Sequence, residues 1–101
     1  MRLTPVQQAV IRTVSAESFG EKAVVWLFGS RLDDSKKGGD IDLYIEPEIQ
    51  EADELVAAKL HFLLELHKRL GEQKIDVVIR RALGDELPIY RIAKETGVRL
   101  L

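Results

Sequence analysis

Residues 40–46 alternate polar and apolar side chains with a period of two, and this alternation most constrains the fold. A β-strand with one buried face has that period. Ile41, Leu43 and Ile45 are therefore expected to face a core, while Asp40 and Asp42 face away from it. A strand of this kind needs a neighbouring strand and a covering layer of helices, so we expect a layered domain of helices and sheet.

The other elements follow from local patterns along the chain. Thr4 and Pro5 are typical of a helix start, and Gly71 and Gly97 of helix ends. The expected helices span residues 5 to about 18–20, 51–70 and 88 to about 97, and the expected strands span residues 23–28, 40–46 and 74–80, with a short edge strand at 98–101. The order helix, strand, strand, helix, strand, helix predicts one α/β (α+β) domain over residues 1–101, with a mixed sheet packed against helices.

Composition excludes several classes of function. The chain has 15 Lys and Arg against 17 Asp and Glu, for a formal net charge of −2, so direct DNA binding is not expected. The absence of cysteine excludes disulfides, thiolate metal sites and thiol nucleophiles. Since no apolar run is long enough for a signal peptide or a membrane span, we expect a soluble cytoplasmic protein.

Three aspartates interrupt the strand patterns. Asp40 and Asp42 share a strand face at a separation of ~6.6 Å, and Asp76 joins them if its strand lies beside theirs. Three carboxylates at about 5 Å would repel by roughly 3 kcal/mol per pair at an effective dielectric of about 20. A divalent cation relieves that repulsion, and ligation by oxygen alone favours Mg²⁺ or Mn²⁺. The alternative is an acidic sheet face that is simply solvated.

The first expected strand ends at Gly29 and Ser30. A strand that ends in Gly-Ser and turns into a short helix offers N–H groups and a hydroxyl to an anion. Arg31 can pair with phosphate oxygens. The alternatives are an ordinary turn and a surface arginine without a specific role.

Together these residues resemble the DNA polymerase β-type nucleotidyltransferase superfamily. Leu27-Phe28-Gly29-Ser30 is followed after nine residues by Asp40-Ile41-Asp42-Leu43, and later by Ile75-Asp76-Val77. This order is similar to the pattern of that superfamily over residues 23–80. The helix and terminal strand after Pro88 resemble its small stand-alone members, the minimal nucleotidyltransferases.

The resemblance implies a role for each residue. Asp40 and Asp42 would hold two Mg²⁺ ions, and Asp76 would be the third ligand and would activate the acceptor hydroxyl. Gly29 and Ser30 would bind the β- and γ-phosphates of a nucleoside triphosphate, with Arg31 as a further phosphate partner. The implied reaction moves a nucleoside monophosphate, AMP from ATP, onto a hydroxyl and releases pyrophosphate.

The resemblance also implies a partner. Similar prokaryotic proteins are the antitoxins of HEPN/MNT toxin–antitoxin pairs, in which the transferase adenylylates a tyrosine of its HEPN partner. Asp33 and Asp34 depart from the second Arg and the Gly that many family members carry after Gly-Ser-Arg, although Lys36 and Lys37 could offset their charge. This departure keeps open the alternative of a non-catalytic binding subunit that neutralises or complements a partner protein.

The helix at 51–70 has more apolar surface than one sheet face can cover. At about 100° per residue its apolar side chains span an arc of roughly 220°. Exposed contiguous apolar surface usually marks a protein interface. We therefore expect this helix to contact another subunit, either a HEPN partner in a hetero-oligomer or a second copy in a homodimer.

Several side chains are assigned to faces from spacing alone. Tyr44 shares the face of Asp42, where it would either border the acceptor site or lie half-exposed without a role. Trp26 and Phe28 are expected in the core. The expected inward residues are Val6, Val10, Thr13 and Val14 on the first helix, and Ile89, Ile92 and Ala93 on the last.

Overall fold

The computed structural model describes residues 3–29, 41–71, 73–82 and 86–101. In these ranges the elements are, in chain order, α1 (Pro5–Phe19), β1 (Val24–Phe28), β2 (Ile41–Glu46), α2 (Ala52–Leu70), β3 (Ile75–Ile79), α3 (Pro88–Thr96) and β4 (Val98–Arg99). The predicted order of elements and the α+β fold class are confirmed. The short helical turn expected after Ser30 lies outside the described residues.

The strands form one mixed sheet in the order β3-β2-β1-β4. β1 is antiparallel to both β2 and β4, whereas β2 and β3 are parallel. Parallel neighbours need a crossover connection, and the long helix α2 provides it. The register places Phe28 beside Asp42 and Asp42 beside Asp76.

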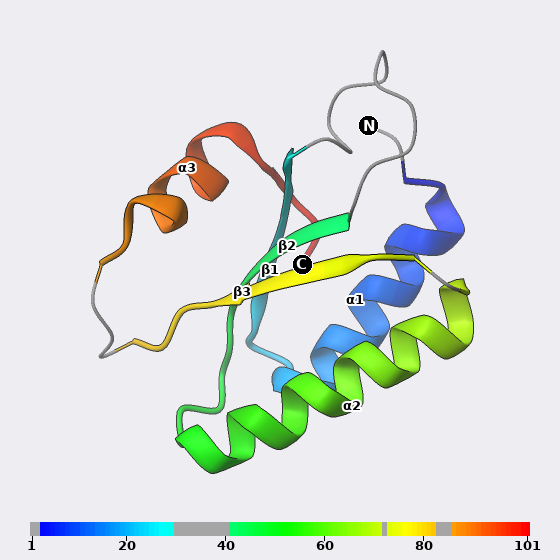
Figure 1. Ribbon diagram of the computed structural model, residues 1–101, viewed down its shortest axis with the longest axis horizontal. Coiled ribbons are helices and arrows are strands. Elements are labelled where there is room, and N and C mark those ends of the chain that lie inside the picture. The colour runs from blue at the N-terminus through cyan, green and yellow to red at the C-terminus, as the bar shows by residue number, and fades with distance from the viewer. Residues whose placement is uncertain (1–2, 30–40, 72, 83–85) are drawn as a thin grey trace.

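Helices cover the two faces of the sheet unequally. Figure 1 shows α1 and α2 on one side of the sheet and α3 on the other. The side with two helices holds the main core, in which Ile41, Leu43 and Ile45 are fully buried, as predicted. The other side holds a smaller cluster built on Tyr44, Tyr90 and Ala93. The acids on β2 and β3 therefore share a face with α3.

α1 begins at the helix start that Thr4 and Pro5 indicate, and a reciprocal pair of hydrogen bonds caps it. The Gln7 N–H donates to Thr4 Oγ1 at 3.1 Å, and the Thr4 N–H donates to Gln7 Oε1 at 2.9 Å. This reciprocal pair satisfies donors that the first helical turn leaves free. Pro5 occupies the first turn, where its missing N–H costs nothing.

Spacing predicted the inward faces of two helices only in part. Val10 and Val14 on α1, and Ile89 and Ala93 on α3, lie in or against a core as predicted. On α1 the buried side chains are Ile11, Val14, Ser15 and Phe19, whereas Val6 and Thr13 are exposed. Val6 lies about 140° around the helix from Ile11, so both cannot face one core. On α3, Ile92 is half-exposed and Tyr90 takes the inward place beside Ala93.

Candidate functional site

Asp42 and Asp76 occupy paired positions on the parallel strands β2 and β3. Paired residues on neighbouring strands project from the same face, with the strands about 4.8 Å apart. Asp42 is partly buried and Asp76 is exposed. The register thus brings together two of the three predicted acids at one end of the α3 face.

Gly29 lies directly against the carboxylate of Asp42. Its φ is +82°, a backbone conformation that residues other than glycine rarely adopt. A Cβ placed at Gly29 would overlap Asp42 Oδ2 and would lie 3.1 Å from Asp42 Cγ. Gly29 therefore leaves the space that the Asp42 carboxylate fills, and the end of β1 lies beside Asp42.

The remaining predicted site residues, Ser30, Arg31 and Asp40, lie outside the described residues, as do the four charged residues Asp33, Asp34, Lys36 and Lys37. Among the described residues no group of three or more His, Cys, Asp or Glu side chains could hold a metal ion. Asp42 and Asp76 supply carboxylate oxygens, which fit the ligand preference of Mg²⁺. Among the described residues, these two side chains would be the ligands of such an ion.

The α3 face of the sheet has three successive rows of paired side chains. The first contains Phe28, Asp42 and Asp76; the second contains Trp26, Tyr44 and Val78; the third begins with Val24 and Glu46. α3 covers the second row, where Trp26 and Val78 pack against the buried cluster of Tyr44, Tyr90 and Ala93. The first row, which contains Asp42 and Asp76, lies next to this second row, toward the start of β2 and β3.

Tyr44 does not border an open acceptor site. It is fully buried, its ring centroid lies 5.6 Å from that of Tyr90, and its hydroxyl donates to Glu46 Oε2 at 2.6 Å. Its hydroxyl group thus interacts with Glu46 in the third row rather than with Asp42. Burial and the Glu46 hydrogen bond raise the pKa of Tyr44 to about 12, so its hydroxyl stays protonated.

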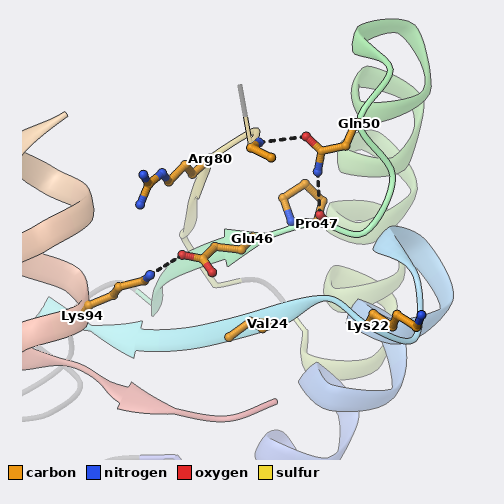
Figure 2. Close-up of a pocket in the computed structure, with 8 residues that line it drawn as sticks. Lys22, Val24, Glu46, Pro47, Gln50, Arg80 and Lys94 are labelled. Atoms are coloured by element: carbon orange, nitrogen blue, oxygen red, sulfur yellow. Dashed lines mark hydrogen bonds and ion pairs between the residues drawn. The ribbon is translucent and has the colours of Figure 1, made fainter. Parts of the chain in front are cut away.

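A cavity of about 390 Å³ lies at the third row, at the opposite end of β2 from Asp42 (Figure 2). Its charged side chains include Lys22, Glu46, Arg80 and Lys94. Lys94 Nζ pairs with Glu46 Oε2 at 2.6 Å, and Arg80 pairs with Glu86 at 2.5 Å. Burial opposes ionisation of Glu46, but the hydrogen bonds from Lys94 and Tyr44 outweigh it and lower the pKa of Glu46.

Sequence reasoning missed this charged cluster. Glu46 and Arg80 continue the polar period of their strands, which was the available signal. Lys94 comes from α3, whose place over this face is a tertiary property. Because Glu46 is paired with Lys94 and Arg80 with Glu86, the cluster joins α3 and the segment after β3 to the sheet.

Comparison with known proteins identifies the family. A family model described as nucleotidyltransferase domain matches residues 10–100, a span that includes Gly29, Asp42 and Asp76. A search of curated proteins gave no match. Within the described ranges no helix is long and apolar enough to cross a membrane. The matched span covers most of the chain, and this protein therefore belongs to the nucleotidyltransferase domain family.

Proposed function

We propose that this protein transfers AMP from ATP to a hydroxyl acceptor and releases pyrophosphate, using Asp40, Asp42 and Asp76 as its carboxylates. The observation that carries the proposal is the pairing of Asp42 with Asp76 directly beside Gly29. Paired acids next to a close backbone approach suit a metal-bound triphosphate. Ser30 and Arg31 are the proposed phosphate partners on the sequence pattern.

The proposed chemistry needs few protein groups. The acceptor oxygen attacks the α-phosphorus, the bond from that phosphorus to the pyrophosphate oxygen breaks, and pyrophosphate leaves. Asp76 takes the hydroxyl proton, since it is exposed on the same face as Asp42. When bound, two Mg²⁺ ions would neutralise the charge on the phosphates and favour in-line displacement. Asp40 and Asp42 are the proposed main ligands of these ions.

The proposed acceptor is a tyrosine hydroxyl of a HEPN toxin in the cytoplasm, so that the protein acts as an antitoxin. The support is the resemblance of the Gly-Ser, Asp-x-Asp and later Asp pattern to minimal nucleotidyltransferases of toxin–antitoxin pairs. Exposure of Asp76 is compatible with an acceptor as large as a protein side chain.

The test is transfer of label from ATP labelled at the α-phosphate, in the presence of Mg²⁺ and a HEPN protein encoded beside this chain. We expect label on the partner. Asp76→Asn should lower the rate by at least about 100-fold because it removes the proton acceptor, and Asp42→Asn should abolish labelling. Exposed Glu95→Gln on α3 is the control and should label normally. Unchanged labelling by folded Asp42→Asn and Asp76→Asn proteins would refute the site.

A second candidate is a non-catalytic subunit that neutralises its partner by binding alone. Asp33 and Asp34 favour it, because they put negative charge in the segment between the proposed phosphate residues and Asp40. Toxin neutralisation separates the two functions. Asp42→Asn should lose neutralisation if transfer is required, and should retain it if binding suffices.

A further inference from the structure

A row of large apolar side chains runs along the outward side of α2. Val56, Leu60 and Leu64 are 63%, 66% and 57% exposed. Residues four apart lie next to one another on a helix surface, so the three form a continuous stripe, here called the outer row. The inward side of the same helix buries Leu55, Ala58, Phe62 and Leu66. In Figure 1, α2 lies at an outer margin of the molecule, so the outer row is accessible to another chain.

The two ends of α2 carry residues of opposite charge. Asp53 and Glu54 lie in its first turn, and His67, Lys68 and Arg69 lie in its last. Asp53 and His67 are each seven residues from Leu60, which puts both within about 20° of it around the helix. Val56 and Leu64 are each four residues away. The outer row is thus flanked by acidic residues at one end and by basic residues at the other, where Lys68 and Arg69 also pair with Glu65 of the same helix.

This arrangement is complementary to an antiparallel copy of itself. Antiparallel pairing about Leu60 brings the acidic first turn of each helix to the basic last turn of the other. The two helix dipoles then point in opposite directions, which is also favourable. Parallel pairing would place acid beside acid and base beside base. A two-fold interface requires one surface to be complementary to itself, and the outer row meets that condition.

A hollow beside the outer row adds room for a partner side chain. It has a volume of about 220 Å³ and lies between the first half of α2 and the end of β3, where Val56, Leu55 and Ile79 contribute to its wall. A leucine from a second helix packed on the outer row could enter it. We infer that two copies of this chain form a dimer by antiparallel packing of their outer rows. This inference is independent of the proposed transfer reaction.

Sedimentation equilibrium of the purified chain tests the dimer. We expect the wild-type protein to be dimeric. Leu60→Glu should weaken the dimer by at least about tenfold, because it buries two like charges at the centre of the interface. Val6→Glu is the matched control: Val6 is a 71% exposed apolar residue on α1, away from the outer row, and its variant should remain dimeric. Circular dichroism confirms that both variants fold.

The absence of cysteine allows the direction of pairing to be tested by oxidation. A disulfide needs Cα atoms about 4.4–6.8 Å apart. Leu60→Cys should link to its own copy. Val56→Cys should not, because antiparallel packing separates the two positions by about 12 Å along the axis, but it should link to Leu64→Cys when the two proteins are mixed.

Each contrary result overturns the inference. A wild-type monomer, or a complex that forms through Leu60 only with a different protein, rules out the homodimer. Self-linking of Val56→Cys shows parallel pairing. Equal dissociation of the Val6→Glu and Leu60→Glu proteins places the interface elsewhere.

Discussion

At the scale of single residues, Gly29 leaves free the space that the Asp42 carboxylate occupies. Gly29→Ala should cost about 1–2 kcal/mol of unfolding free energy from its positive φ. It should also displace Asp42, because the new Cβ overlaps the carboxylate oxygen. We expect nucleotidyl transfer by the folded variant to fall strongly, as measured with labelled ATP.

The chain contains a matched control for that substitution. Gly71 has a nearly identical φ of +83°, but a Cβ there meets nothing within 4 Å. Gly71→Ala should therefore show a similar loss of stability in urea unfolding and retain full transfer activity. Equal activity of the two variants would mean that the contact between Gly29 and Asp42 is irrelevant to function.

Glu46 should make stability depend on pH. Its pKa is lowered from the ordinary value of 4.5, since hydrogen bonds from Lys94 and Tyr44 outweigh burial. A depressed pKa means that the stabilisation is complete above pH 4.5 and is lost as the pH falls below that value. Unfolding free energies measured from about pH 6 to about pH 3 should fall less steeply for Glu46→Gln than for the wild type. The exposed Glu95→Gln protein should follow the wild-type slope, and a wild-type slope for Glu46→Gln would contradict the assignment.

At the scale of elements, Gly97 joins α3 to β4 where three backbones meet. Its N–H donates to the Ala93 carbonyl at 2.8 Å, and a Cβ there would overlap that oxygen and lie 2.7 Å from the Leu27 carbonyl oxygen on β1. Gly97→Ala should therefore cost about 1–3 kcal/mol through steric overlap alone, because its φ is negative.

The single tryptophan can report where that strain is relieved. Trp26 on β1 is paired with Arg99 on β4. If Gly97→Ala displaces β4, urea unfolding should show the lower stability and the native fluorescence of Trp26 should change. Wild-type stability together with wild-type fluorescence would show that the junction adapts without cost.

The helices and strands were predictable because their signals are local. The capping pair at Thr4 and Gln7, Gly71 after α2 and the alternation along β2 each specify structure within a few residues. The inward faces of α1 and α3 were less predictable. Both helices have apolar side chains on more than one side, and only packing against the sheet decides which of them, such as Ile11 rather than Val6, is buried.

At the scale of the whole molecule, the sequence predicted which acids could meet but not what surrounds them. The sequence predicted that Asp76 would join Asp42 if their strands were neighbours, and β2 and β3 are neighbours in the sheet. The place of α3 depends on long-range contacts between Tyr90, Ala93 and Tyr44, and no local pattern encodes them. Strand spacing indicates Glu46 and Arg80, but it could not predict that Lys94 joins them, because that contact depends on the place of α3.

The strand order also bears on how a reactant of the proposed transfer would reach Asp76. β3 is the outermost strand on its side of the sheet, so in the described part of the chain no further strand flanks it. In the proposed reaction, a substrate group would therefore reach the exposed Asp76 along this edge strand as well as over the face that bears the acids. Under the proposed function, this edge position of Asp76 suits an acceptor hydroxyl that projects from the surface of a folded protein.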